Sequence, residues 1–111
     1  MKKEFRVKKS AEIEEIIKFK DVIGSKHFVL YKKENHENNH YRFALSVPKK
    51  YGHAVERNQI KRRIRSIVRE EKIVNNVDLF VVVKVTASNL SFEEIKEELL
   101  DLFQKAQILE D

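Results

Sequence analysis

One stretch of the sequence holds most of the residues that could do chemistry, and that chemistry is the binding of a polyanion. Ten Lys or Arg residues and three Glu lie between Tyr41 and Lys72, a net charge of +7, whereas the whole chain of 111 residues carries +5. Lys and Arg neutralise phosphates and release counterions, and guanidinium groups make paired hydrogen bonds to phosphate oxygens. The segment therefore predicts a phosphate-bearing partner, and RNA is the first candidate.

A helix from about Glu56 to Lys72 sorts these residues onto two faces. At about 100° per residue, the aliphatic residues share one side; they are Ile60, Ile64, Ile67 and Val68. The adjacent arc carries Asn58, Lys61, Arg62, Arg65 and Arg69, with Arg57 at its border. Solvated helix faces usually mix the signs of their charges, whereas this one has Glu only near its ends. We therefore expect a continuous basic stripe that can follow a phosphate ribbon.

The histidines suggest two other kinds of site. His36-Glu37-Asn38-Asn39-His40 matches the pattern of zinc peptidases, but that chemistry requires a helix and a third ligand. The neighbouring residues are polar and typical of a loop, so we interpret the pattern as a solvated connection. His53, beside the basic helix, is the best candidate general base for an independent nuclease, although we expect it in an RNA-contacting loop. Tyr51 could stack on a base or pack against a sheet.

The composition limits the class of protein. A chain of 111 residues with 41% hydrophobic residues is sufficient for one core, so we expect a single domain over 1–111. The absence of Cys excludes disulfides and thiolate metal sites. No apolar run approaches the roughly 20 residues that span a bilayer, and no apolar stretch of signal-peptide length follows the basic N-terminus. We therefore expect a soluble cytoplasmic protein that does not act at a membrane.

The elements before the basic helix are predicted to be one helix and two strands. Ser10 suits an N-cap, and an apolar stripe follows at helical spacing, formed by Ile13, Ile16 and Ile17. The segments 27–33 and 41–47 are rich in β-branched and aromatic residues, which is typical of strands. Because a polar connection joins them, we expect these two strands to form a hairpin that ends at Pro48. Residues 49–55 then form a loop around Gly52.

The elements after the basic helix are predicted to be one strand and one helix. Residues 78–85 form a nearly continuous apolar run, which indicates a central strand buried on both faces. Ser91 and Glu94 form a capping box that opens the last helix, whose apolar face includes Phe92 and Phe103. Helices and strands in this order predict a single-domain two-layer α/β (α+β) sandwich. A strand–helix–strand unit over 41–85 would by default cross over right-handed.

The basic helix and its approach resemble the bacterial ribonuclease P protein component. The matching pattern is Gly52-x-Ala54-Val55-x-Arg57-Asn58-x-x-Lys61-Arg62-x-x-Arg65, preceded by Ser46-Val47-Pro48-Lys49-Lys50. The resemblance covers nearly the whole chain, since the basic entry at residues 6–9, the strand at 28–31, the late apolar strand and the last helix follow in the family's order. It implies a mixed β-sheet packed by three helices with a left-handed βαβ crossover. The family has four strands, whereas only three are evident here.

The resemblance also implies a function. The protein would assist a catalytic RNA that removes the 5′ leader of precursor tRNA, with Mg²⁺ bound mainly by the RNA subunit and no organic cofactor. The implied partners are ribonuclease P RNA and precursor tRNA, and no obligate protein partner is evident. The expected RNA-binding residues are Lys49, Lys50, His53, Arg57, Asn58, Lys61, Arg62, Arg65 and Arg69.

A second expected site is a leader-binding cleft formed by Ile13, Ile17 and Tyr31. Tyr31 matches an aromatic residue of the family's cleft, and Phe28 lies on the opposite face of the same strand. The family often has aromatic residues where this chain has Ile13 and Ile17, and Phe19 could compensate only if its side of the helix faces the cleft. We expect no protein catalytic residue and no metal ligand.

The residues leave one further interpretation open. A non-catalytic RNA-binding module, such as a ribosomal or duplex-binding protein, could use the same basic helix. It differs from the leading interpretation in one observable, because only a ribonuclease P subunit should alter cleavage by a catalytic RNA. A protein-only nuclease would instead cleave without any RNA subunit.

Overall fold

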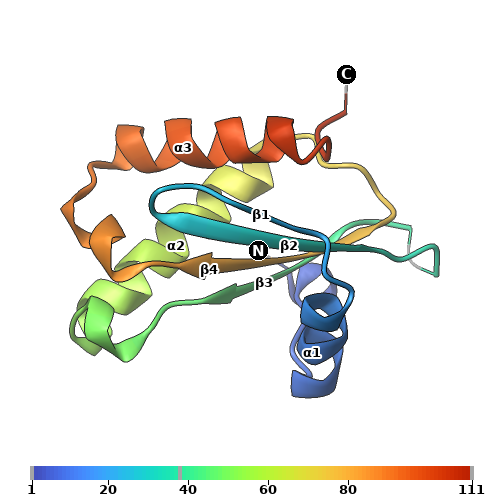
Figure 1. Ribbon diagram of the computed structural model, residues 1–111, viewed down its shortest axis with the longest axis horizontal. Coiled ribbons are helices and arrows are strands. Elements are labelled where there is room, and N and C mark those ends of the chain that lie inside the picture. The colour runs from blue at the N-terminus through green and yellow to red at the C-terminus, as the bar shows by residue number, and fades with distance from the viewer. Residues whose placement is uncertain (1, 38, 111) are drawn as a thin grey trace.

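A mixed β-sheet with helices on both faces organises the chain (Figure 1). The structure is a computed structural model that describes residues 2–37 and 39–110. Within these residues the sheet has four strands: β1 (Val22–Gly24), β2 (Phe28–Glu34), β3 (Arg42–Ser46) and β4 (Val77–Val83). The α-helices of the same residues are α1 (Ser10–Lys18), α2 (Ala54–Glu70) and α3 (Phe92–Lys105). Three short 3₁₀ helices, η1 (Lys3–Phe5), η2 (Lys49–Tyr51) and η3 (Val85–Asn89), complete the described elements.

The strand order is β1-β2-β4-β3, so β4 lies between the two strands that we expected to form a hairpin. That hairpin prediction is wrong: β2 pairs antiparallel with β4 along its whole length, and β3 pairs parallel with β4. The apolar run of β4 explains the difference, because a strand with both faces apolar is fully covered only at the centre of a sheet. The expectation of a central, buried strand is confirmed, since nearly every residue of β4 is buried.

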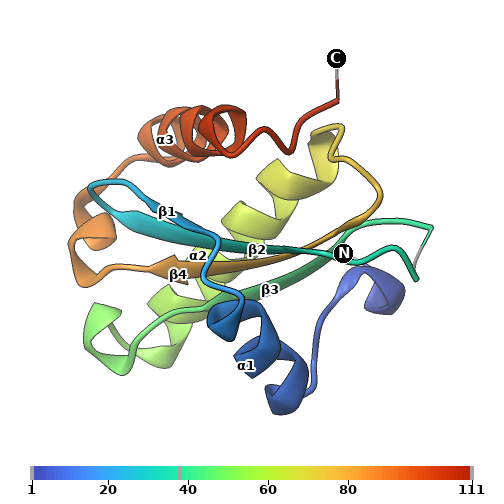
Figure 2. The ribbon, with the colours of Figure 1, turned by 45° about the vertical axis from the view of Figure 1, so that its right-hand side comes forward.

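The helices divide between the two faces of the sheet (Figures 1 and 2). α2 and α3 cover one face, where residues such as Leu30, Leu79 and Val81 pack against Ile64 and Leu99 in the main core. α1 covers part of the other face, over a smaller cluster of Val7, Ile16, Ala44 and Phe80. The predicted α/β sandwich, a mixed sheet packed by three helices, is confirmed, and α1 lies on the face opposite α2 and α3. Among the described residues, no helix has both the length and the apolar character needed to cross a membrane.

Several boundaries differ from the sequence-based expectations. α1 begins at Ser10 itself, and its N-cap is Lys9, which makes no side-chain capping bond. β1 was missed, because three residues are too few to show a period. The capping box of α3 is confirmed: Ser91 Oγ accepts a hydrogen bond from Glu94 N at 3.2 Å, and Glu94 Oε1 accepts one from Ser91 N at 3.0 Å. Phe92 was expected in the core but is exposed, because it stands at the first turn of α3.

Candidate nucleic-acid interface

The orientation of α2 is set by its aliphatic face. Ile60, Ile64, Ile67 and Val68 are all buried in the main core, as the periodicity predicted. Burying four aliphatic side chains stabilises the docked helix by several kcal/mol, at about 1.5–3 kcal/mol each. The charged residues of the helix are therefore held on a rigid element in one rotational setting.

The basic stripe of α2 lines a shallow surface groove of about 450 Å³. Its lining residues, which we call the basic groove, are Val55, Asn58, Lys61, Arg62 and Arg65. Four of these are predicted RNA-binding residues, so the structure brings that part of the prediction together. Among the residues that the structure describes, no carboxylate lines the groove. A concave cationic surface without acidic residues attracts a phosphate backbone and offers no competing ion pair.

The approach to α2 presents three more of the predicted residues. Lys49 and Lys50 lie exposed in η2. His53 is the exposed N-cap of α2, and its side chain makes no capping bond. At Gly52 an added Cβ would lie 3.2 Å from Glu56 Cβ, so the chain turns tightly into the helix here. The positive end of the helix dipole adds to the charge of these side chains.

Tyr51 packs against the protein instead of extending into solvent. It is half-buried and contacts the main core. Burial raises the pKa of its phenol above the ordinary value, an effect that Arg63 partly opposes and Glu56 reinforces. The structure therefore favours the packing role over base stacking for this residue.

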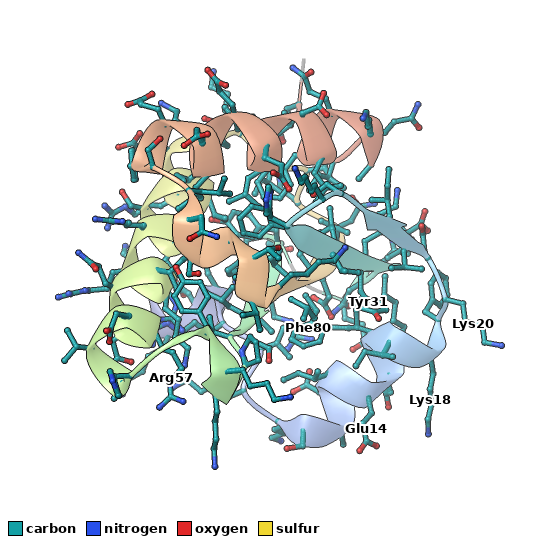
Figure 3. The ribbon with its side chains drawn as sticks, turned by 60° about the vertical axis from the view of Figure 1, so that its left-hand side comes forward. Glu14, Lys18, Lys20, Tyr31, Arg57 and Phe80 are labelled. Carbon is teal, nitrogen blue, oxygen red and sulfur yellow. The ribbon has the colours of Figure 1, made fainter. Side chains whose placement is uncertain are left out.

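Tyr31 lies on the face of the sheet that carries α1, which we call the α1 face. It pairs across the strands with Phe80, and the two rings stack with centroids 5.9 Å apart at 29°. Phe28 is buried on the opposite face, as expected. Figure 3 looks toward Tyr31 and Phe80, with Arg57 of α2 on one side and Glu14 of α1 on the other.

The apolar residues of α1 and its C-cap differ in how deeply their side chains are buried in the α1 face. Ile13 is half-buried and packs against the same small cluster as Tyr31. Ile17 is 39% exposed at the following turn of the helix. Phe19 is the C-cap of α1 and is 53% exposed, so it stands at the end of the helix beyond Ile17. The α1 face thus combines one aromatic pair with an aliphatic edge.

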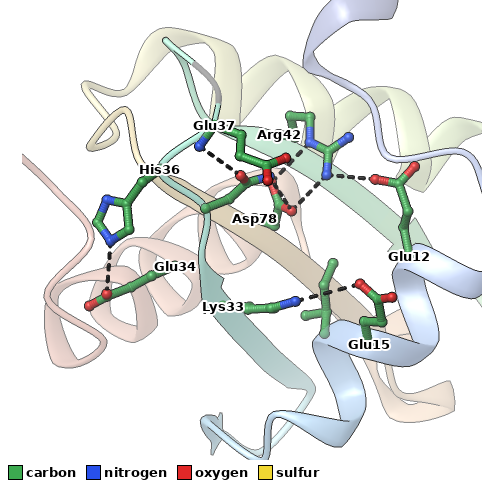
Figure 4. Close-up of a pocket in the computed structure, with 10 residues that line it drawn as sticks. Glu12, Glu15, Lys33, Glu34, His36, Glu37, Arg42 and Asp78 are labelled. Carbon is green, nitrogen blue, oxygen red and sulfur yellow. Dashed lines mark hydrogen bonds and ion pairs between the residues drawn. The ribbon is translucent and has the colours of Figure 1, made fainter.

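A network of charged residues fixes α1 to the end of the sheet (Figure 4). Arg42 donates from Nε and Nη2 to the two carboxylate oxygens of Asp78, at 3.0 and 2.8 Å, and from Nη2 to Glu12 Oε2 at 2.7 Å. Asn35 Nδ2 donates to Asp78 Oδ2 at 3.0 Å. The hydrogen bond to Asp78 raises the pKa of Arg42, against the opposing effect of burial, and Glu12 raises it further. Arg42 therefore stays charged and joins β3 and β4 to α1.

Positive charge in this interface disfavours the charged form of Arg65 and favours the negative form of Tyr41. Burial lowers the pKa of Arg65, and the positive charge of Arg6 lowers it further. Near the other end of α2, the charge of Arg69 opposes the rise in the pKa of Tyr41 that burial causes. Such uncompensated positive charge is the property expected of a surface that an anion completes.

The zinc-peptidase pattern does not form a site in the described residues. His36 Nε2 pairs with Glu34 Oε2 at 3.3 Å, whereas His40 Nδ1 lies 2.8 Å from its neighbour's oxygen, Tyr41 O. The segment lies between β2 and β3, and Asn38 of this pattern lies outside the described residues. In residues 2–37 and 39–110, no three His, Asp or Glu side chains are grouped so as to hold a metal ion.

Two parts of this interface could not be expected from the sequence. Phe80 was read only as part of a buried strand, and no signal linked it to Tyr31 until the strand register was known. Arg6 was expected only as part of a basic entry segment, but it lies close enough to Arg65 to shift its pKa. The roles of the predicted RNA-binding and cleft residues stay predictions.

Comparisons with known proteins agree with the geometry. The sequence profile of the family described as Ribonuclease P matches residues 1–107. A "Ribonuclease P protein component" of Streptococcus pneumoniae (strain Hungary19A-6) is 40% identical over 113 residues, covering 100% of this chain and 91% of that protein.

Solved structures show the same similarity. The RNase P protein of Staphylococcus aureus is 32% identical with a TM-score of 0.88, covering 96% of this chain and 98% of that one. The RNase P protein from Thermotoga maritima is 26% identical with a TM-score of 0.81, covering 90% and 96%. The strand order and the parallel pairing of β3 with β4 through α2 fit the βαβ unit that the resemblance implied, and the hand of that crossover stays a prediction. The chain therefore belongs to the ribonuclease P protein component family.

Proposed function

We propose that this chain, a protein subunit of the ribonuclease P endoribonuclease, binds the catalytic RNA through α2 and the 5′ leader of precursor tRNA through the α1 face. In this role it assists the Mg²⁺-dependent removal of the leader. The observation that carries the proposal is the basic groove, a cationic surface on a rigidly docked helix whose described lining residues include no carboxylate.

The basic groove supports binding to an RNA backbone. Two RNA molecules repel each other, and a cationic protein between them reduces that repulsion and holds the substrate in place. Lys61, Arg62 and Arg65 share the groove with the amide of Asn58, so charge and a hydrogen-bonding group are available together. Lys49, Lys50 and His53 extend the same surface toward the start of α2.

The α1 face suits a single-stranded leader of variable sequence. Stacking on an aromatic ring tolerates any base, because every base has a π-face. Tyr31 is half-buried and its ring is held by Phe80, so little side-chain entropy is lost when a base stacks on it. In Figure 3 the view toward Tyr31 and Phe80 also shows Arg57 of α2, which offers a cation to the RNA backbone.

The chemistry of the interface does not fit a protein-bound Mg²⁺. Mg²⁺ prefers carboxylate and phosphate oxygens, whereas the basic groove presents cationic side chains and one amide. In the proposed function Mg²⁺ is therefore bound by the RNA. The residues of this chain contribute binding, charge screening and positioning.

The first test is cleavage of precursor tRNA at low Mg²⁺ by a bacterial ribonuclease P RNA, with and without this protein. We expect stimulation and a 5′-phosphate on the mature tRNA. Tight RNA binding without stimulation would replace the proposal with a non-catalytic RNA-binding module. Cleavage by the protein alone would overturn both and point to His53.

A second test separates the leader site from general RNA binding. Tyr31→Ala should weaken binding of leader-bearing precursor tRNA by about 1–2 kcal/mol, roughly 5–30-fold, because one stacked base loses its platform. Affinity for mature tRNA should change much less. Phe92→Ala, which removes an exposed aromatic ring on α3, is the matched control and should leave both affinities unchanged. An equal loss for both RNAs in Tyr31→Ala would mean that Tyr31 has only a structural role.

A further inference from the structure

A row of side chains crosses the α1 face and becomes more exposed toward the edge of the sheet. Val22 of β1 pairs with Tyr31 of β2, and Tyr31 pairs with Phe80 of β4. Phe80 in turn pairs with Ala44 of β3. Cross-strand partners point to the same face of a sheet, so all four side chains lie on the α1 face. Ala44 and Phe80 are buried, Tyr31 is half-buried and Val22 is 48% exposed. The α1 face therefore opens toward β1.

The end of α1 adds exposed side chains close in sequence to this edge. Three of the six large apolar side chains that are exposed in the described residues lie between positions 17 and 22. They are Ile17, Phe19 and Val22, and Lys18 and Lys20 stand between them in the sequence; we call these five residues the α1-end patch. In the view of Figure 3, Tyr31 lies between Phe80 and Lys20. Exposed rings beside cations are typical of surfaces that bind single-stranded RNA.

The two lysines of the α1-end patch favour an anionic partner. In residues 2–37 and 39–110, no ion pair joins Lys18 or Lys20 to a carboxylate. The adjacent carboxylate, that of Asp21, lies 3.8 Å from the ammonium group of Lys32. The positive charge of the patch is therefore complementary to a phosphate backbone.

The backbone at Lys20 is strained. Lys20 follows the C-cap of α1 and has a φ of 62°, in the left-handed region. Glycine is the usual residue at this position of a helix end, because a Cβ atom is crowded there. Gln107 takes the same position after α3, with a φ of 59°. Of these two side chains, that of Lys20 is the one beside an exposed aromatic residue, Phe19. A cation retained at a strained position points to a function for its charge.

We propose that the α1-end patch binds the part of the precursor-tRNA leader that lies upstream of the nucleotide on Tyr31, with a base on Phe19 and a phosphate at Lys20. Neighbouring strands are about 4.8 Å apart, so a strand leaving Tyr31 meets Val22 next. In Figure 3, Arg57 of α2 and Lys20 lie on opposite sides of the aromatic pair. Nucleotides at the patch are therefore those farther from the catalytic RNA. This inference rests on the proposed function, because it extends the same leader site.

The test compares two leaders on precursor tRNA bound by the complex of ribonuclease P RNA with this protein. The short leader is the shortest one whose binding Tyr31→Ala weakens. The long leader extends it by roughly four nucleotides, at the lower end of single-strand site sizes. The wild type should bind the long leader more tightly. Phe19→Ala should weaken binding of the long leader by about 5–30-fold and leave the short one unchanged, because one stacked base loses its platform. Phe92→Ala is the matched control and should change neither.

Lys20→Gly separates a binding role from a structural one. Glycine relieves the crowding of the left-handed conformation by more than it adds to the freedom of the unfolded chain, so Tm should rise by about 2–4 °C. Affinity for the long leader should nevertheless fall, and its salt slope should decrease by about one unit, because one phosphate contact is lost. A structural role alone predicts the higher Tm with affinity unchanged. Gln107→Gly is the matched control: its Tm should rise similarly, with both affinities unchanged.

The outcomes separate this inference from the proposed function. The inference is overturned if the wild type binds both leaders equally, or if Phe19→Ala and Lys20→Gly keep the full preference for the long leader. The proposed function survives either result as long as Tyr31→Ala weakens binding of leader-bearing substrate. If Tyr31→Ala weakens no leader, both are overturned. A second copy of the chain on the patch would make the wild type a dimer without RNA and Phe19→Ala a monomer; that result in sedimentation would also overturn the inference.

Discussion

Asp78→Asn should destabilise the protein by about 2–3 kcal/mol, because it breaks the charged network that joins α1 to the sheet. The Asp78 side chain is 7% exposed and accepts two hydrogen bonds from Arg42 and one from Asn35. Removing one partner of a buried ion pair costs about 3–5 kcal/mol. The expected cost is lower here, because the Arg42 side chain is 19% exposed and keeps its bond to Glu12.

Thermal unfolding followed by circular dichroism at pH 7 measures this effect. With an unfolding entropy of about 2.1 cal/mol/K per residue, the expected loss lowers Tm by about 9–13 °C. Glu12→Gln is the matched control: Glu12 is 33% exposed, and its loss should cost less than about 1 kcal/mol. The double variant should lose more than the sum of the two, since Arg42 then has neither carboxylate. A smaller effect for Asp78→Asn than for Glu12→Gln would refute the reasoning.

Three further predictions concern the interface, the core and the β1–β2 turn. Arg57→Ala should weaken RNA binding by about 1–2 kcal/mol and reduce the salt slope by about one unit, and unchanged affinity at moderate salt would contradict its place in the interface. Ile64→Ala should cost about 2–5 kcal/mol in a denaturant titration, whereas Val55→Ala, at a position 75% exposed, should cost almost nothing. Burial raises the pKa of Glu98, but hydrogen bonds from Ser25 and His27 outweigh it, and the net pKa is lowered. Glu98→Gln should therefore lower Tm at pH 7, with the difference from wild type shrinking as the pH falls below about 4.5; a constant difference down to low pH would contradict this.

The parts of the structure that follow from local patterns could be predicted from the sequence. The spacing of the Ile residues in α2 is sufficient to define its core face and its basic stripe. In a helix, the number of positions between two residues determines whether their side chains lie on the same face. The capping box of α3 is likewise a local signal. Both depend on residues a few positions apart.

The parts that depend on distant pairing could not be predicted. Two apolar strands such as β2 and β4 can be ordered in several ways, and only the closed sheet selects one. The stacking of Tyr31 on Phe80 follows from that register. The approach of Arg6 to Arg65 depends on the bridge of the N-terminal segment to Phe43. No periodicity in the chain encodes any of these contacts.

The central place of β4 also affects how the protein emerges from the ribosome. β2 and β3 both pair with β4, so until β4 has been synthesised β2 can pair only with β1, and β3 has no strand to pair with. α2 ends at Glu70 and is complete before the sheet that must bury its aliphatic face exists. At about 5–20 residues per second, this interval lasts about one to three seconds. Until β4 is complete, the main core cannot hold the aliphatic face of α2, so completion of β4 is the step that fixes the basic residues of the helix in one orientation.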